Sequence, residues 1–75
     1  MAQRMRLTAI IEREDGGFAS LCPELDIASQ GSSVEEAQAN LAEALTLFFV
    51  TADASEVGRR LHSEVFVTQA EVPVG

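Results

Sequence analysis

Two acidic side chains, Glu24 and Asp26, have the spacing of a carboxylate pair that could exchange protons with a substrate. In an extended segment, residues two positions apart lie on the same side of the backbone. A turn kept in water by its charges accounts for the same two acids, and we favour that interpretation. If Glu12 joined them, three carboxylates could bind the two metal ions of a nuclease. This metal-dependent nuclease is an alternative hypothesis, because the first predicted strand has no carboxylate before Glu12.

The single cysteine, Cys22, and the single histidine, His62, are the other residues that could do chemistry. A catalytic thiol needs a nearby base or cation that lowers its pKa, and nothing in the sequence brings His62 to Cys22. One cysteine and one histidine also cannot supply the usual ligands of a zinc site. We therefore interpret Cys22 as a buried apolar residue and His62 as a surface residue. We expect no catalytic residue, metal or cofactor, and predict that the chain is not an enzyme.

Acidic residues dominate the charge: twelve Asp and Glu stand against five Arg and no Lys, a formal net charge of -7. Proteins bind phosphate backbones with clustered Arg and Lys, and the pair Arg59-Arg60 is a weak signal in an acidic chain. We therefore expect no direct binding to nucleic acid. A basic protein would be attracted to this chain at long range. The alternative is that the acidity only keeps a small protein soluble.

The elements that must position these residues begin with a β-hairpin. Residues 5–12 alternate in polarity, as a half-buried strand does, and residues 14–17 supply turn-forming Asp and Gly. Residues 18–22 return as a second strand. A third extended segment, residues 25–30, follows Pro23. Because the connections are too short for parallel crossovers, the three strands are predicted to form an antiparallel meander.

A helix over residues 34–51 is predicted next. Ser33 can cap its first turn, and Glu36 is expected to reach back to the amide of the cap residue in a capping box. Residues 53–62 could be a loop or a loop with one helical turn. Residues 64–68 are rich in β-branched and aromatic side chains and predict a fourth strand. The order β-β-β-α-β predicts a single α+β domain over residues 1–75, with one helix packed on one face of the sheet.

Apolar side chains on the second face of this sheet predict self-association. Ile10 lies among polar positions of the first strand, while Val65 and Val67 point to one side of the fourth strand and Phe66 to the other. One helix covers one face only, and an uncovered apolar face usually marks an interface. A homo-oligomer that uses these four residues is therefore expected, and a chain of this length gains stability from a second copy.

Several short motifs resemble the HicB-like antitoxin family, of the HicB/UPF0150 type. They are Gly16-Gly17-Phe18, then Cys22-Pro23-Glu24-Leu25-Asp26, then Ser29-Gln30-Gly31-Ser32-Ser33-Val34-Glu35-Glu36-Ala37, then Asn40-Leu41-Ala42-Glu43-Ala44. The resemblance spans about residues 5 to 50. It implies a partial RNase H-like fold and an antitoxin that binds and silences a small basic RNA-cleaving toxin of the HicA type.

The resemblance also implies where a partner would bind. Glu12, Glu14 and Asp15 at the hairpin tip, together with Glu24 and Asp26, are the candidate contacts for a basic toxin. Many family members carry a further C-terminal DNA-binding module, which we do not expect here because the sequence ends after the fourth predicted strand. An orphan homo-oligomeric domain without a toxin is the alternative.

The expected location is the cytoplasm. The N-terminus has no apolar segment of the kind that begins a secretory signal. The longest apolar run, residues 45–50, is too short to span a bilayer.

Overall fold

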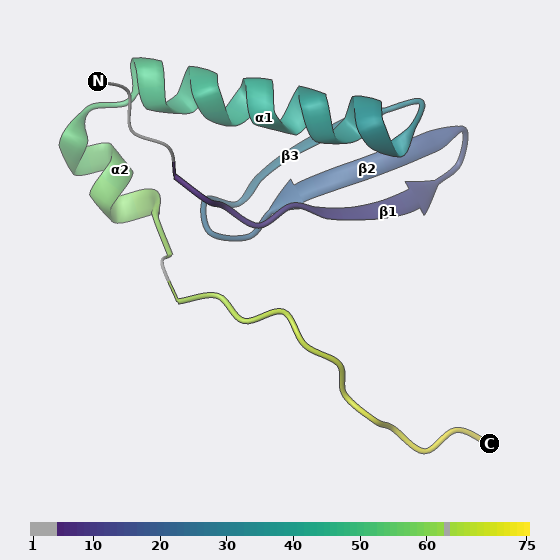
Figure 1. Cartoon of the computed structure of the whole chain (residues 1–75). Helices are drawn as coiled ribbons and strands as arrows, with labels where there is room; N and C mark the ends of the chain where they lie inside the picture. The colour runs from purple at the N-terminus through teal and green to yellow at the C-terminus, as the bar shows by residue number, and fades with distance from the viewer. Residues whose placement is uncertain (1–4, 63) are drawn as a thin grey trace.

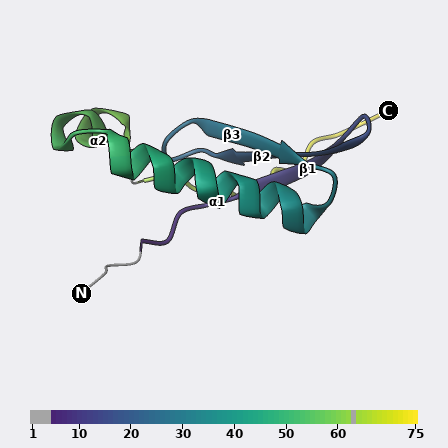
Figure 2. The same cartoon turned by 90° about the horizontal axis from the view of Figure 1, so that it is seen from above.

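The computed structural model describes residues 5–62 and 64–75, which form a three-stranded antiparallel sheet and two helices (Figure 1). The strands pair in the order β1-β2-β3, and α1 lies along one face of the sheet (Figures 1 and 2). In chain order the elements are β1 (Ile10–Glu14), β2 (Gly17–Cys22), β3 (Ile27–Gly31), α1 (Val34–Thr51) and α2 (Ala54–Arg60). The α+β class and the antiparallel meander are thus confirmed.

The predicted hairpin is formed by β1 and β2, which a two-residue turn joins. Glu14 pairs with Gly17 across the turn, and Gly16 between them has a φ of 79°, in the left-handed region that glycine adopts without strain. The first strand begins at Ile10, five residues later than predicted. The reason is that β2 ends at Cys22 and Pro23 follows, so none of the described strands continues opposite residues 5–8.

The helix α1 packs closest to β3, where Gly31 allows the two backbones to approach. A Cβ atom added at Gly31 would lie 2.5 Å from the backbone nitrogen of Ala37. On the neighbouring strand, the buried Ser20 hydroxyl donates a hydrogen bond of 3.0 Å to the carbonyl oxygen of Ala37. Since Ala37 is itself fully buried, the first turns of α1 are fixed to the sheet by close contact as well as by a hydrogen bond.

Of the two hydrogen bonds that the capping box predicts at the start of α1, one is confirmed. Ser33 has an extended backbone, and its hydroxyl accepts a 3.0 Å hydrogen bond from the Glu36 amide. The Glu36 carboxylate, however, accepts from the amide and hydroxyl of Ser32 at 2.7 and 3.1 Å, rather than from the amide of Ser33. The carboxylate therefore reaches one residue further back than the capping-box pattern predicts.

Residues 53–62, which the sequence left open, contain the short helix α2. Asp53 caps it by accepting a 2.8 Å hydrogen bond from the Glu56 amide. At its other end, Arg60 donates to the carbonyl oxygen of Leu25 at 3.0 Å and lies over the Phe48 ring, 5.2 Å from its centroid. The helix is thereby fastened both to α1 and to the turn between β2 and β3.

The core lies between the sheet and α1 and is small. Cys22, Leu25 and Leu41 form its fully buried centre. Partly buried apolar side chains surround this centre: Leu7, Ile27, Leu45, Phe48, Phe49 and Leu61. Of the residues that the structure describes, Leu61 is the last in the sequence that packs against this centre.

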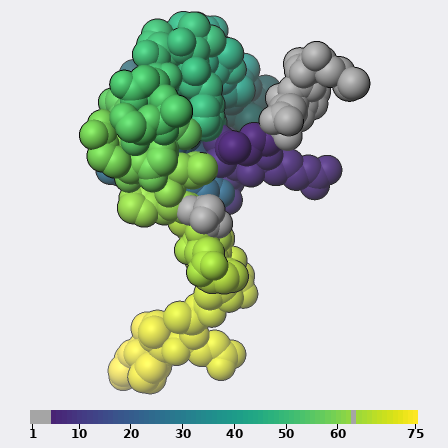
Figure 3. Space-filling view, turned by 90° about the vertical axis from the view of Figure 1, so that its left-hand side faces the viewer, coloured from purple at the N-terminus to yellow at the C-terminus, as the bar shows by residue number. Residues whose placement is uncertain are grey.

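The predicted fourth strand and the partial RNase H-like fold are not confirmed. Residues 64–75 are extended, belong to no strand, and run away from the sheet and helices (Figures 1 and 3). The radius of gyration is accordingly 14.5 Å, against about 11 Å for a compact chain of this length. Within residues 5–62 and 64–75, no strand lies beside residues 64–68 to satisfy their backbone hydrogen-bonding groups. We call residues 64–75 the C-terminal segment.

Among the residues that the structure describes, neither helix has the length and apolar character needed to cross a membrane.

Candidate partner-binding site

The five acids predicted to bind a partner occupy three different places. Glu12, Glu14 and Asp15 are exposed at the end of the β1-β2 hairpin. Glu24 is buried, with 9% of its surface exposed, and Asp26 is exposed in the turn between β2 and β3. Since this turn and the hairpin tip lie at opposite ends of β2, the five acids do not form one surface.

The buried Glu24 carboxylate is held by hydrogen bonds inside the molecule. It accepts from the Thr8 backbone amide at 3.0 and 3.1 Å and from the Thr8 hydroxyl at 2.6 Å. The Cys22 thiol donates a longer hydrogen bond of 3.4 Å. Burial alone would raise the pKa of Glu24, but the hydrogen bonds, above all those from Thr8, outweigh it and lower this pKa below its ordinary value. Glu24 thus holds residues 5–9 to the end of β2 and is not available to a partner.

The carboxylate pair considered for acid/base or nuclease chemistry is not formed. Asp26 has a φ of 56°, a left-handed conformation that aspartate tolerates better than most residues, and its side chain faces solvent. Glu12 lies opposite Ala19, three residues before Cys22 and thus about 10 Å from the end of the strand. In residues 5–62 and 64–75, no three His, Cys, Asp or Glu side chains are placed to hold a metal ion.

Cys22 is fully buried, and burial is the main reason why the pKa of its thiol is raised. His62 is exposed, and its backbone amide donates a 2.6 Å hydrogen bond to the carbonyl oxygen of Glu24. A thiolate nucleophile needs the opposite conditions, namely access to solvent and a lowered pKa. The interpretation of Cys22 as a buried apolar residue is confirmed, and so is that of His62 as a surface residue.

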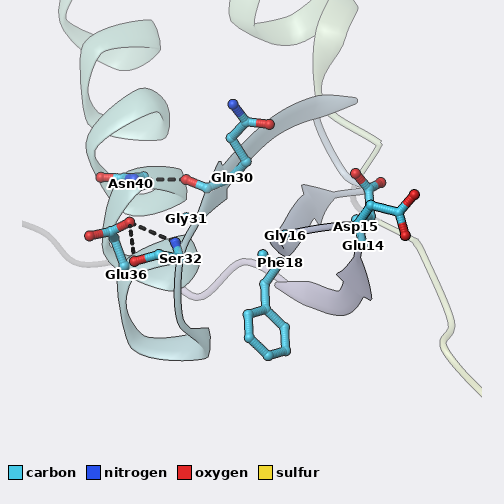
Figure 4. A pocket seen from close by; sticks show the side chains of 10 residues that line it. Glu14, Asp15, Gly16, Phe18, Gln30, Gly31, Ser32, Glu36 and Asn40 are labelled. Carbon is cyan, nitrogen blue, oxygen red and sulfur yellow. Dashed lines mark hydrogen bonds between the residues drawn. The ribbon is translucent and has the colours of Figure 1, made fainter.

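The hairpin tip and the start of α1 enclose a shallow pocket of about 490 Å³ (Figure 4). Figure 4 shows Glu14 and Asp15 on one side of Phe18, with Ser32, Glu36 and Asn40 on the other. The residues that line it are Glu14, Asp15, Gly16, Gly17, Phe18, Gln30, Gly31, Ser32, Glu36 and Asn40. We call this region the hairpin pocket.

The helix side of the hairpin pocket is fixed by hydrogen bonds. The bonds from the backbone and hydroxyl of Ser32 lower the pKa of the exposed Glu36 carboxyl, so this group stays ionised at neutral pH. Asn40 donates a 2.7 Å hydrogen bond to the carbonyl oxygen of Gln30 and thereby links α1 to β3. The carboxylate of Glu36 is therefore presented from a rigid element.

The hairpin side of the pocket contains an aromatic ring next to acidic residues. Phe18 is partly buried, and the Arg13 guanidinium lies 4.7 Å from its ring centroid. Glu12 and Glu14 lie on the same side of β1 as Ile10, the side away from α1, because alternate residues of a strand share a face. The hairpin end thus combines several carboxylates with one apolar ring, and no metal ligand set is found among the described residues, an arrangement suited to binding a cationic surface.

Only part of this site is predicted from the sequence. Glu14 and Asp15 are predicted as partner contacts, whereas Glu36 is predicted as a capping residue alone. Phe18 and Asn40 belong to the motifs that resemble the HicB-like family, and those motifs were the available signal for both.

The four residues predicted to form an oligomer interface lie in two places. Ile10 is partly exposed on β1 opposite Leu21, on the sheet face away from α1. Val65, Phe66 and Val67 belong to the C-terminal segment, where Phe66 is 85% and Val67 62% exposed. Within one copy of the chain these two groups belong to separate surfaces.

Comparison with known proteins finds one similar curated sequence. Over 46 residues the chain is 48% identical to UPF0150 protein ssl0738 of Synechocystis sp., an alignment that covers 59% of this chain and 64% of the relative. The match therefore spans slightly less than two thirds of the relative's length. No protein-family model matches the chain, and no solved structure does.

Proposed function

We propose that this protein is a non-enzymatic antitoxin-like protein that binds and neutralises a small basic RNA-cleaving toxin of the HicA type. The hairpin pocket and the acids beside it are the proposed binding surface, with Glu12, Glu14 and Asp15 as the principal contacts. Binding there covers the RNA-binding surface of the toxin and so prevents cleavage. The proposal places the protein in the cytoplasm, where such a toxin meets its RNA.

The observation that carries this proposal is the acidic end of the hairpin. Exposed carboxylates project there from a tight turn, and Glu36 adds an ionised carboxylate from the adjoining helix. A protein that cleaves RNA binds phosphates with Arg and Lys, so its working surface is positively charged. Complementary charge speeds the encounter of two such proteins and orients them. A net charge of -7 on a 75-residue chain adds to the long-range part of that attraction.

The name of the similar protein from Synechocystis supports the proposal. The motifs in this chain resemble the HicB-like family of the HicB/UPF0150 type, and the similar protein from Synechocystis is called a UPF0150 protein. The resemblance to that family supports a small basic toxin as the partner, and the geometry of this chain supports the hairpin pocket as the binding surface.

Co-expression of the chain with the genes that flank it tests this proposal. The native complex is purified through a tag on this chain, and its mass and components are measured by light scattering and mass spectrometry. We expect a stoichiometric assembly that contains a small basic protein encoded next to the chain. A homo-oligomer alone would contradict the antitoxin role and support the orphan-domain alternative.

The three carboxylates that the nuclease alternative requires do not lie together. Of its three carboxylates, Glu24 is bonded inside the molecule, and Glu12 and Asp26 lie toward opposite ends of β2. Purified protein incubated with RNA or DNA and with magnesium or manganese is expected to show no cleavage.

A further inference from the structure

The C-terminal segment has the properties of a strand, but none of the described strands of its own chain pairs with it. We propose that residues 64–68 of one copy add as a fourth strand to the free edge of β1 in a second copy, so that two chains exchange their C-terminal segments. This inference concerns assembly and does not depend on the proposed function.

The free edge on the receiving copy runs along residues 5–9 and β1. Thr8 turns its amide toward Glu24, on the side of β2. Because successive amides of an extended strand point to opposite sides, the amides of Leu7 and Ala9 point away from β2. They lie on the outer edge of the sheet, since β1 is the first strand of the order β1-β2-β3. An edge of this kind is a template for pairing with another chain.

Beside this edge lies a groove that a strand could fill. Because α1 lies mainly over β3 and β2, its flank on the β1 side is left open. A groove of about 1040 Å³ runs between residues 5–9 and that flank, and Leu7, Leu41, Leu45 and Phe49 give it an apolar lining. A strand placed along β1 would therefore contact the sheet edge on one side and the flank of α1 on another.

The C-terminal segment has the side chains that this position requires. A strand beside β1 would have α1 over one face and the sheet surface that includes Ile10 on the other. In parallel register with residues 7–9, Val65 and Val67 align with Leu7 and Ala9 under α1. Phe66 then lies on the opposite face, near Ile10. Apolar residues on both sides are typical of a strand that is buried on both faces.

Charge is matched in the same register. The receiving edge contains Arg6 and Arg13, and the C-terminal segment contains Glu64 and Glu71. Both pairs are seven residues apart, so setting Glu64 against Arg6 also sets Glu71 against Arg13. Opposite charges placed across neighbouring strands favour pairing.

The direction of the C-terminal segment favours pairing with a second copy over pairing with the sheet of its own chain. The His62 amide is fixed to the Glu24 carbonyl, close to the chain's own Thr8, yet from residue 64 onward the segment runs away from its own groove (Figure 3). Val65 is partly buried and every other residue of the segment is exposed. An exposed, extended segment that leaves its own free edge empty fits the corresponding edge of another copy.

The first test measures self-association of the full-length chain by sedimentation. The wild type is expected to form a dimer, with twice the monomer mass of 8.0 kDa. Val67→Pro removes an amide donor and a side chain from the added strand, and we expect it to raise the dimer dissociation constant about tenfold or more. Val74→Pro, near the end of the same segment, is the matched control and should leave the constant unchanged. Circular dichroism checks that both variants keep their helices.

The second test distinguishes exchange of the C-terminal segments between two chains from folding of the segment onto the sheet of its own chain. Chains with Arg6→Cys are mixed with chains with Glu64→Cys, a pair that the same register sets side by side, and oxidised, while the buried Cys22 is present in all samples. Exchange predicts a disulfide between the two chains, and neither variant alone should give it. A doubly substituted chain that forms only an internal disulfide would overturn the proposal, as would a monomeric wild type or a dimer that Val67→Pro leaves intact.

Discussion

At the residue scale, Glu24 connects segments that are far apart in the sequence. Its carboxylate holds Thr8 and accepts from Cys22, while its backbone carbonyl accepts from the amide of His62. Through these bonds one turn residue fixes the start of the chain and the residue after α2 to the end of β2. The sequence spacing of Glu24 and Asp26 could not indicate this, because an acid that meets internal donors and an acid in water have the same local pattern.

Glu24→Gln tests this role. A glutamine has only one acceptor oxygen and places an amide NH₂ next to the Thr8 donors, so the free energy of unfolding should fall by about 1–3 kcal/mol. Urea unfolding at pH 7 measures the loss. Glu43→Gln, at an exposed position on α1, is the control and is expected to change the value by less than about 0.5 kcal/mol.

Glu24→Gln should also change how the free energy of unfolding depends on pH. Folding lowers the pKa of Glu24 from its ordinary value of 4.5, so its ionisation stabilises the folded state above that pH. This contribution is lost as the pH falls through the lower pKa of the folded protein. Glu36 and Asp53 act in the same direction, since their pKa values are also lowered. Glu24→Gln should therefore flatten, without abolishing, the loss of stability below pH 4.5, and an unchanged slope would contradict the assignment.

At the scale of elements, the contact between β3 and α1 depends on the absence of a side chain at Gly31. Gly31→Ala would place a Cβ atom against the backbone of Glu36 and Ala37, which cannot move as a side chain can. We expect a loss of about 1–3 kcal/mol, the usual cost of overpacking. Gly58→Ala in α2 is the matched control, because nothing lies within 4 Å of its added Cβ atom. That change should be neutral or stabilise the protein by up to about 1 kcal/mol. Thermal unfolding of both variants measures the contrast, and an equal effect would show that the close approach does not matter.

The elements differ in how far the sequence predicted them. The bounds of α1 were predicted correctly because Ser33 gives a local start signal and apolar residues recur with helical spacing over five turns. The helix α2 has only seven residues, too few to show that spacing. The alternation in residues 5–12 was a true sign of extended backbone. Whether such a segment belongs to a sheet, however, depends on a neighbouring strand, and the part of the chain that the structure describes supplies none for residues 5–8 and 64–68.

At the scale of the whole molecule, charge placement rather than net charge should determine binding to a basic partner. The combined variant Glu12→Gln, Glu14→Gln and Asp15→Asn changes the formal charge from -7 to -4. We expect it to weaken binding of the co-purified basic protein about tenfold or more and to reduce the salt dependence of that binding. The control variant Asp26→Asn, Glu43→Gln and Glu56→Gln has the same net charge and should bind nearly as the wild type does. Equal losses in both variants, measured by calorimetry at two salt concentrations, would assign the effect to net charge alone.

The most direct test of the proposed function is RNA cleavage by the small basic protein that we expect to co-purify with this chain, measured with and without the purified chain. We expect one equivalent of wild-type chain to stop cleavage, and a clear excess of the variant Glu12→Gln, Glu14→Gln and Asp15→Asn to be required for the same effect. Cleavage that continues at full rate in the presence of excess wild-type chain would contradict the antitoxin function.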